Sequence, residues 1–223
     1  MYFFIFLVYS FDFTFLDKEN HSMAKSSYEK PDFWTQKAKK EGYPARSIYK
    51  LEEINEKFRL LKKNMHILDI GAAPGSWSLW VLRKFKSFHD QSMLVSVDLS
   101  DLTIPKDKPN FHFIQGDIFS DVVQKQLITY GPFDLILSDA APATTGNSTV
   151  DTSRSEELVR CVLDLSAEHL KTGGALVCKF FIGGGQQELL SQAKSTFKTV
   201  RTYKPEACRT SSFETYLIAQ QKL

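Results

Sequence analysis

A loop of small residues between positions 67 and 78 constrains the fold of this chain more than any other feature. The segment reads Ile-Leu-Asp-Ile-Gly-Ala-Ala-Pro-Gly-Ser-Trp-Ser, an apolar strand followed by small residues and the start of a helix. The spacing Gly71-x-x-x-Gly75 is neither the glycine pattern of dinucleotide folds nor the phosphate loop of triphosphate-binding proteins. It favours a ligand with ribose and adenine but no phosphates, S-adenosylmethionine, at the carboxyl end of a parallel sheet. A tight turn without a ligand is the alternative.

Length and composition limit the organisation of the chain. The 223 residues, 43% of them hydrophobic, suffice for one sizeable core but hardly for two. The formal net charge of +2 does not by itself indicate a nucleic-acid partner. Cys161, Cys178 and Cys208 are far apart and lack the short paired spacings of zinc or redox motifs. These cysteines predict a reducing compartment and no bound metal.

The first 22 residues differ in composition from the rest. They are rich in aromatic and aliphatic side chains, are interrupted by Asp12, and contain no cation before Lys18. This pattern lacks the basic start of a secretory signal and the arginines of a transit peptide, and it is short for a membrane span. We expect residues 1–22 to be an extension outside the fold, residues 23–223 to form one domain, and the protein to be cytoplasmic. A segment that targets the protein to an organelle is the alternative.

Short apolar segments alternate with helical ones along the chain. Five of them have the length and composition of buried parallel strands: His66–Ile70, Leu94–Asp98, Phe111–Gln115, Phe133–Ser138 and Ala175–Phe180. Residues 199–203 and 215–219 read as a closing hairpin, and a long helix is expected to stop before Gly173. The pattern predicts an α/β fold with a mostly parallel seven-stranded sheet and helices on both faces.

A basic helical segment precedes the first strand. Its aromatic residues Trp34 and Tyr43 are interleaved with the cations Lys37, Lys39, Lys40, Arg46 and Lys50. Cations interleaved with stacking rings are typical of surfaces that follow an RNA backbone. A solvated helix face is the alternative.

Acidic residues end two of the predicted strands. Asp98 follows the glycine loop by one strand, where its carboxylate can accept hydrogen bonds from both hydroxyls of an adenosyl ribose. Asp117 follows the next strand and can meet the adenine amino group, and Trp77 can wall the pocket. Each has an ordinary alternative: an aspartate that starts a loop, a Gly-Asp turn and a core tryptophan.

Four separated motifs together resemble the FtsJ/RrmJ family. They are Tyr43 to Leu51, Asp69 to Ser78, Leu137 to Pro142, and Cys178 to Phe180. The resemblance covers roughly residues 27–223. It implies a Rossmann-like class I methyltransferase fold and a monomeric S-adenosylmethionine-dependent enzyme that methylates a ribose 2′-hydroxyl, on a uridine of large-subunit ribosomal RNA. A tRNA ribose methyltransferase of the same family and a non-catalytic RNA-binding assembly factor are the alternatives.

The resemblance also implies the site residues. The family's Lys-Asp-Lys-Glu catalytic tetrad corresponds to Lys50, Asp139, Lys179 and Glu214. The implied cofactor contacts are Gly75, Trp77, Asp98, Asp117 and Asp139. The segment 208–213 is less basic than in the family, which weakens the expectation of RNA contacts there.

The chemistry of a ribose hydroxyl explains these residue types. The hydroxyl is a poor nucleophile, so a base must take its proton as the methyl group arrives in line. Lys179 is the candidate because a central strand would bury it. The cation of Lys50 favours the neutral form of Lys179 that a base requires, whereas Asp139 and Glu214 favour the charged form. The residues therefore leave open whether Lys179 is the base or a charged group that stabilises the oxyanion.

Overall fold

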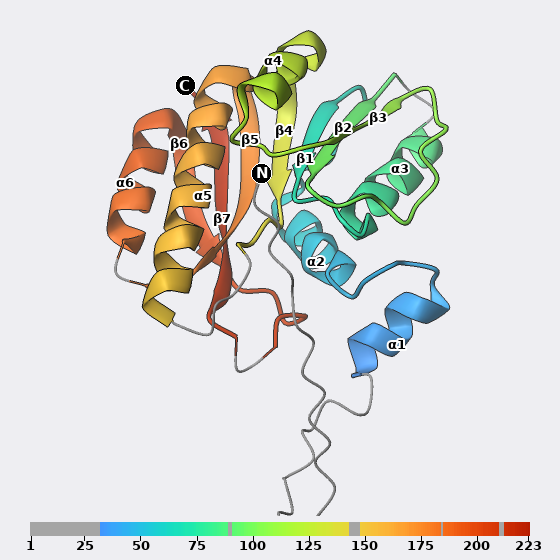
Figure 1. Cartoon of the computed structure of the whole chain (residues 1–223), viewed down its shortest axis with the longest axis horizontal. Helices are drawn as coiled ribbons and strands as arrows, with labels where there is room; N and C mark the ends of the chain where they lie inside the picture. The colour runs from blue at the N-terminus through green and yellow to red at the C-terminus, as the bar shows by residue number, and fades with distance from the viewer. Residues whose placement is uncertain (1–31, 89–90, 143–147, 184, 210–211) are drawn as a thin grey trace, which may run out of the picture. The chain divides into compact units, whose positions relative to one another are not determined.

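In the part of the chain that the structure describes, seven strands form one sheet in the order β3-β2-β1-β4-β5-β7-β6 (Figure 1). The computed structural model describes residues 32–88, 91–142, 148–183, 185–209 and 212–223. The strands are β1 His66–Ile70, β2 Met93–Asp98, β3 Phe111–Gln115, β4 Phe133–Ser138, β5 Leu170–Phe181, β6 Phe197–Tyr203 and β7 Glu214–Lys222. The extension predicted for residues 1–22 lies outside the described residues.

The sheet is parallel except at β7, which runs antiparallel to both β5 and β6. The predicted mostly parallel sheet and the closing hairpin are thus confirmed. Within the β5–β7 register, Lys179 is opposite Tyr216 and Phe181 is opposite Glu214. Because side chains alternate along a strand, Glu214 and Tyr216 lie on the same face of the sheet as Lys179.

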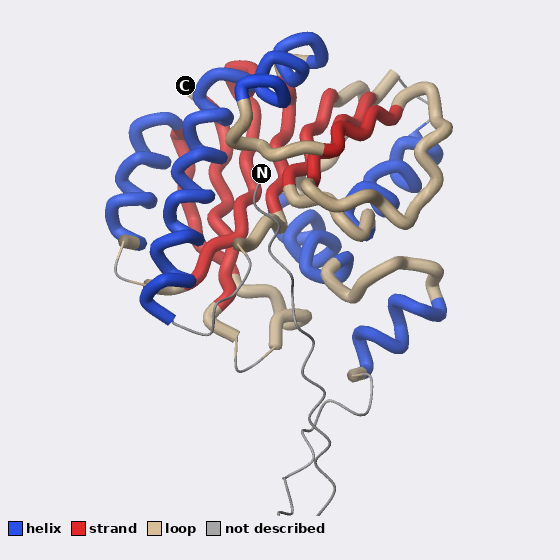
Figure 2. Tube along the Cα trace, in the orientation of Figure 1, coloured by secondary structure: helices blue, strands red, loops and turns tan. Residues whose placement is uncertain are grey.

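Within the described residues, six helices cover the two faces of the sheet (Figure 2). They are α1 Phe33–Lys40, α2 Ile48–Phe58, α3 Ser76–Phe88, α4 Asp121–Tyr130, α5 Ser148–His169 and α6 Gln186–Thr196. Side chains of the first three helices pack with Leu135 in one hydrophobic cluster. Those of the last three pack with Ile136 in the other. Adjacent residues of β4 thus belong to opposite cores, as in a strand that is buried on both faces.

Local sequence sets the helix boundaries. Asp32 caps α1 by accepting a hydrogen bond from the Thr35 amide at 2.9 Å, and Ser120 caps α4 through the Val123 amide at 3.3 Å. Gly42, at φ +71°, takes the left-handed conformation in the predicted break between α1 and α2.

The sheet extends further than the apolar pattern predicts at β5. The predicted strand starts at Ala175, whereas β5 starts at Leu170, directly after α5. Leu170 pairs with Phe133, and a register shift separates this pair from the pairing of Leu135 with Ala175. Helix α5 does end before Gly173, as predicted, but it ends at His169, and Gly173 and Gly174 lie within an irregular stretch of strand.

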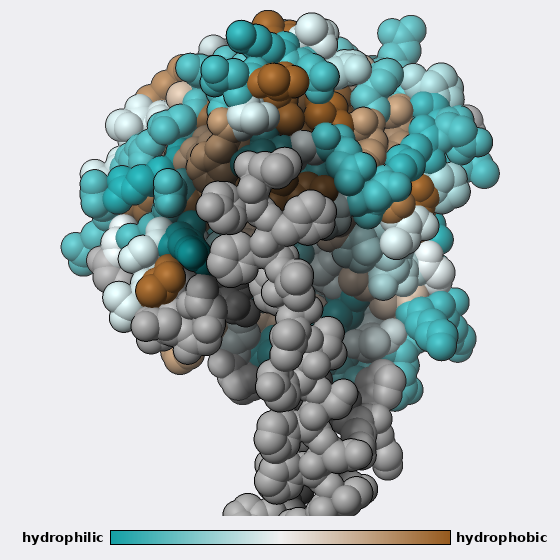
Figure 3. All heavy atoms as spheres, viewed as in Figure 1, coloured by the Kyte–Doolittle hydropathy of each residue, from teal (hydrophilic) through white to brown (hydrophobic). Residues whose placement is uncertain are grey.

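The surface in Figure 3 is largely hydrophilic, with hydrophobic residues gathered over α4. Val122 and Ile128 on this helix are 68% and 63% exposed, whereas Val123 and Leu127 are buried. Helix α4 thus packs through one narrow face.

Among the helices that the structure describes, none combines the length and hydropathy needed to cross a bilayer.

Candidate active site

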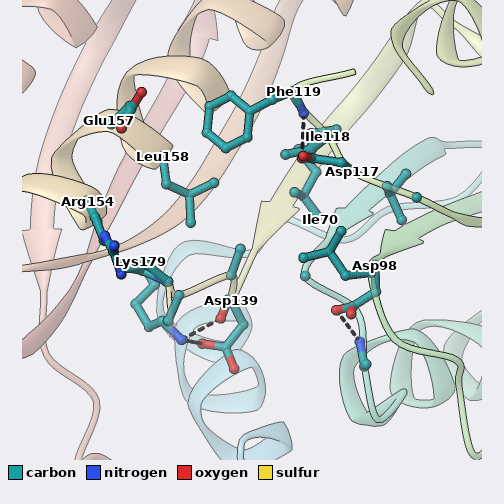
Figure 4. Close-up of a pocket in the computed structure, with 18 of the residues that line it drawn as sticks. Ile70, Asp98, Asp117, Ile118, Phe119, Asp139, Arg154, Glu157, Leu158 and Lys179 are labelled. Atoms are coloured by element: carbon teal, nitrogen blue, oxygen red, sulfur yellow. Dashed lines mark hydrogen bonds and ion pairs between the residues drawn. The ribbon is translucent and has the colours of Figure 1, made fainter. Parts of the chain in front are cut away.

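A pocket of about 650 Å³ opens at the carboxyl ends of the parallel strands (Figure 4). This is the edge where ligands bind in open α/β sheets, and the volume suits a small-molecule ligand. Residues at the ends of four strands contribute to its wall: Gly71, Asp98, Asp117 and Asp139. Lys179 of β5 and Arg154, Glu157 and Leu158 of α5 also line it.

The glycine loop contributes Gly71, Ala73 and Pro74 to the pocket wall, and its two glycines have no room for a side chain. Gly71 has φ +74°, and an added Cβ would lie 2.5 Å from the Ala140 Cα. Gly75 has φ +112°, and an added Cβ would lie 2.9 Å from the Ile104 side chain. Both glycines therefore let the loop pack closely against Ala140 and Ile104. That a ligand also approaches the loop backbone stays a prediction.

Asp98 is held in place between two loops. Its Oδ2 accepts a hydrogen bond from the Ala73 amide at 2.9 Å, and its Oδ1 accepts one from the Ser100 amide at 2.8 Å. Each carboxylate oxygen has a second acceptor site. The carboxylate is therefore fixed and keeps acceptor sites for further hydrogen bonds, and its contact with a ribose stays a prediction.

Asp117 lies beside Asp98 along the pocket wall. The Gly116 amide donates to the Asp98 carbonyl at 2.9 Å, and Oδ1 of Asp117 accepts from the Phe119 amide at 2.9 Å. Figure 4 shows Asp98 and Asp117 on one side of the pocket and Asp139 with Lys179 on the other. The predicted adenosyl and methyl-transfer ends are therefore separate.

Two residues predicted as cofactor contacts do not line the pocket. Gly75 faces Ile104, and Trp77 is 2% exposed in the core. The Trp77 indole donates to the Ser47 carbonyl at 2.8 Å, and its ring lies 5.9 Å from that of Tyr216. Trp77 is thus a core tryptophan, the alternative considered from the sequence, and its hydrogen bond to Ser47 connects it to the pocket wall.

A buried carboxyl group lies beneath the glycine loop. Asp69 of β1 is fully buried, and its Oδ2 accepts from the Ser78 hydroxyl at 2.6 Å. Its Oδ1 has no hydrogen-bond partner within the described part of the chain. Burial raises the pKa of Asp69 from 3.8 to about 7, and Asp139 and Asp98 add to this effect against the Ser78 hydrogen bond.

Two members of the predicted tetrad form an ion pair at the end of the pocket. Lys179 Nζ lies 3.1 Å from Oδ1 of Asp139 and also donates to the Asp139 carbonyl. The two side chains are 11% and 16% exposed. Burial makes this pair less screened by salt than a surface pair.

The other two members form a second ion pair. Lys50 of α2 donates to Oε1 of Glu214 at the start of β7. Burial alone would raise the pKa of Glu214, but the Lys50 ammonium, its hydrogen bond and that of Tyr216 hold this pKa below its usual value. Glu214 is therefore ionised at neutral pH.

Tyr216 joins the two pairs and was missed by sequence reasoning. Its hydroxyl oxygen lies 2.7 Å from Asp139 Oδ1 and 2.6 Å from Glu214 Oε1. Burial and the two carboxylates raise the pKa of Tyr216 well above its ordinary value, so the hydroxyl stays protonated. The alternation of side chains along a strand could have identified it, because Tyr216 follows Glu214 by two residues and therefore lies on the same face of the sheet.

These five groups form one connected chain: Lys179, Asp139, Tyr216, Glu214 and Lys50. It contains two cations and two carboxylates, so its charges balance. The carboxylates can orient the two ammonium groups, and one of these groups faces the pocket.

Several side chains of the predicted RNA surface make contacts within the protein instead. Arg46 pairs with Asp32 and donates to the Ala207 carbonyl, so it ties α1 to the segment before β7. The Arg83 guanidinium lies 4.2 Å over the Tyr43 ring, and Trp34 packs 5.0 Å from Tyr49. Lys39 and Lys40 remain exposed on α1.

The three cysteines are free thiols, and Cys208 lies near the tetrad. Its Sγ is 3.8 Å from Oε1 of Glu214. Burial raises the pKa of Cys208 to about 11, and the Glu214 carboxylate adds to this effect. In the described ranges, no three His, Cys, Asp or Glu side chains are grouped as metal ligands.

Comparison with known proteins agrees with this geometry. The family model of FtsJ-like methyltransferases matches residues 43–222. The ribosomal RNA large subunit methyltransferase E of Treponema denticola is 50% identical over 88% of this chain and 97% of its own length. The protein of the same name from Borrelia garinii subsp. bavariensis is 45% identical over 86% and 97%. A crystal structure described as a ribosomal RNA methyltransferase from Plasmodium falciparum has a TM-score of 0.70 and 33% identity, over 81% of this chain and 99% of that one.

Proposed function

Because the chain belongs to the FtsJ-like methyltransferase family and uses S-adenosylmethionine as methyl donor, we propose that it methylates the 2′-hydroxyl of a ribose. The proposed acceptor is a uridine of large-subunit ribosomal RNA. The similarity of nearly full-length relatives supports the class of RNA. The connected tetrad at the end of the pocket carries the proposal for the hydroxyl, because acceptor deprotonation or oxyanion stabilisation calls for ammonium groups held in place.

The pocket fits the proposed methyl donor. Its volume is about 650 Å³, Gly71 of the glycine loop lines it, and Asp98 offers acceptor sites on a fixed carboxylate. We assign the ribose hydroxyls to Asp98 and the adenine amino group to Asp117. When bound, S-adenosylmethionine supplies an electrophilic methyl group on a positively charged sulfur.

We assign the step at the acceptor oxygen to Lys179. Asp139 holds its Nζ through the carboxylate and the main-chain carbonyl, which limits the rotamers of the lysine. In its neutral form Lys179 can take the hydroxyl proton. In its charged form it can stabilise the developing oxyanion, with the proton passing to water.

Lys50, Glu214 and Tyr216 complete the site, and the Tyr216 hydroxyl connects them to Asp139. Lys50 is the second ammonium group of the tetrad, and Glu214 fixes its position. The Tyr216 hydroxyl keeps the Asp139 and Glu214 carboxylates at a set separation. We therefore propose Tyr216 as a positioning residue.

Methyl transfer from S-adenosylmethionine with a tritiated methyl group tests the proposal. The acceptors are unmethylated large ribosomal subunits, free ribosomal RNA and tRNA. Alkali cleaves RNA through the free 2′-hydroxyl, so a 2′-O-methylated nucleotide remains in an alkali-resistant dinucleotide. We expect the label in such dinucleotides, from large subunits or their RNA.

Other outcomes would contradict specific parts of the proposal. Label in alkali-released mononucleotides would indicate base methylation. Label mainly in tRNA would favour the related tRNA activity. Binding to large subunits without any transfer would favour a non-catalytic assembly factor.

We further propose that the protein works as a monomer in the cytoplasm. All five groups of the site come from one chain, so a partner subunit is not needed to complete it. Light scattering after size-exclusion chromatography and fractionation of cells test these two points. A stable dimer or recovery in an organelle would contradict them.

A further inference from the structure

Arg154 is a cationic residue of the pocket that the tetrad does not use. It lies on α5 and contributes to the pocket wall together with Leu158, one helical turn further along. Figure 4 shows Arg154 reaching from this helix toward the end of the pocket where Lys179 and Asp139 lie. The residue thus shares the proposed methyl-transfer end with the tetrad.

The charge balance at this end singles Arg154 out. The pocket wall contains two cationic side chains, Lys179 and Arg154. Lys179 is paired with Asp139, whereas Arg154 forms no hydrogen bond or ion pair within the described part of the chain. The Glu157 carboxylate lines the wall on the same helix but is not bound to Arg154, so the donors of the Arg154 guanidinium are open to a ligand.

The exposure of Arg154 indicates which ligand it meets. Arg154 is exposed, whereas the side chains of Lys179 and Asp139 are 11% and 16% exposed. It therefore stands at the mouth, where an extended ligand arrives from solvent. A planar guanidinium fork with open donors matches the oxygens of a phosphate.

We infer that Arg154 binds the RNA phosphate next to the methylated ribose. This inference rests on the proposed function. The carbon that carries the 2′-hydroxyl is bonded to the carbon that carries the 3′-oxygen, so an acceptor ribose at Lys179 brings its 3′-phosphate to the same end of the pocket. The neutral tetrad does not offset the charge of that phosphate, and Arg154 does.

The test compares Arg154→Ala with Arg160→Ala. Arg160 lies on the same helix but is paired with Glu188 at 2.8 Å, so the control removes the same charge outside the proposed site. Methyl transfer to unmethylated large subunits is measured at several KCl concentrations. Calorimetry gives the affinities for S-adenosylhomocysteine and for 5′-methylthioadenosine, which lacks the amino-acid carboxylate.

We expect Arg154→Ala to raise the KM for subunits roughly tenfold while kcat changes less than threefold. The slope of log KM against the logarithm of the salt concentration should decrease by about 1, as for the loss of one phosphate contact. Arg154→Lys should recover part of the affinity. Arg160→Ala should match the wild type, and none of the variants should change the affinity for S-adenosylhomocysteine.

Two results would overturn the inference. Weaker binding of S-adenosylhomocysteine with unchanged binding of 5′-methylthioadenosine would assign Arg154 to the cofactor carboxylate. Unchanged KM, salt dependence and cofactor affinity would leave Arg154 as a surface residue. Failure of the proposed function is separate, because it appears as absent ribose methylation by the wild-type protein.

Discussion

The hydroxyl oxygen of Tyr216 lies 2.7 Å from Oδ1 of Asp139, across the boundary between the antiparallel and parallel parts of the sheet. The same oxygen lies 2.6 Å from Glu214. A tyrosine hydroxyl has one proton, so the two carboxylates share a single donor. Loss of this donor should disturb both ion pairs together.

Tyr216→Phe is therefore expected to lower kcat roughly tenfold or more, because the two carboxylates lose the hydrogen-bond donor that positions them, and a hydrogen bond to a charged group contributes about 1.5–3 kcal/mol. The affinity for S-adenosylhomocysteine should stay unchanged. Tyr203→Phe is the matched control, since Tyr203 is opposite Tyr216 in the β6–β7 register but outside the connected chain. Equal kcat in the two variants would remove Tyr216 from the site.

Lys179→Ala should lose methyl transfer by roughly two to four orders of magnitude, the range for general acid–base groups. Calorimetry should show that S-adenosylhomocysteine still binds. Lys171→Ala is the control, because Lys171 is also on β5 but pairs with Asp134 at 2.8 Å. Normal turnover of Lys179→Ala would contradict the tetrad.

Lys179→Arg separates the two roles proposed for the lysine. A guanidinium keeps the positive charge but does not lose its proton at working pH. If Lys179 is the base, this variant should be as inactive as the alanine variant. Near-normal single-turnover rates would instead assign Lys179 to stabilisation of the oxyanion.

Asp98→Ala should weaken binding of S-adenosylhomocysteine by about 1–3 kcal/mol, because ribose hydroxyls lose their acceptor. Asp101→Ala is the control, since that side chain is 58% exposed and pairs with Lys106. Calorimetry measures both. An unchanged affinity of Asp98→Ala would place the ribose elsewhere.

Asp69 should make stability depend on pH. Its pKa is raised from 3.8 to about 7, so between these values the folded state binds the proton more tightly than the unfolded state. The stabilisation is complete below pH 3.8 and is lost as the pH rises toward 7. Melting temperatures measured from pH 5 to 8 should therefore fall more steeply for the wild type than for Asp69→Asn. Burial lowers the pKa of His169, so this residue makes stability rise with pH. His169 is present in both the wild type and Asp69→Asn, so it does not affect the difference between them. Parallel curves would be incompatible with a proton on Asp69.

Removal of residues 1–22 should leave folding and methyl transfer unchanged. The family match begins at residue 43, and each residue assigned to the site lies at position 50 or later. The comparison is between the full chain and one that starts at Met23. Loss of methyl transfer by a well-folded shortened protein would show that the extension takes part in the reaction.

Most of the sheet was predictable because buried parallel strands are short apolar runs. The predicted limits of His66–Ile70 and Phe133–Ser138 agree with β1 and β4. The start of β5 was not predictable, because it depends on the register shift opposite Phe133, which is a property of the paired strands. The inversion of β7 between β5 and β6 is likewise set by pairing between distant segments.

The site was predictable where residue type and motif order suffice. The tetrad residues identified through the resemblance do come together in two ion pairs. Trp77 was placed wrongly relative to the pocket, because a tryptophan after a glycine turn can face either the ligand or the core, and helix α3 turns it toward Tyr216. Arg46 could not be assigned from sequence, because its partner Ala207 is far away in the chain.

The place of β7 affects when the enzyme becomes active during its own synthesis. Among the seven strands β7 comes last in the sequence, yet it lies inside the sheet and carries both Glu214 and Tyr216. Until it has emerged from the ribosome, β5 has an unpaired edge, β6 has no neighbour, and Lys50 has no carboxylate to hold it. With the roles proposed for Glu214 and Tyr216, a nascent chain that has already folded its parallel strands is expected to stay inactive until β7 inserts.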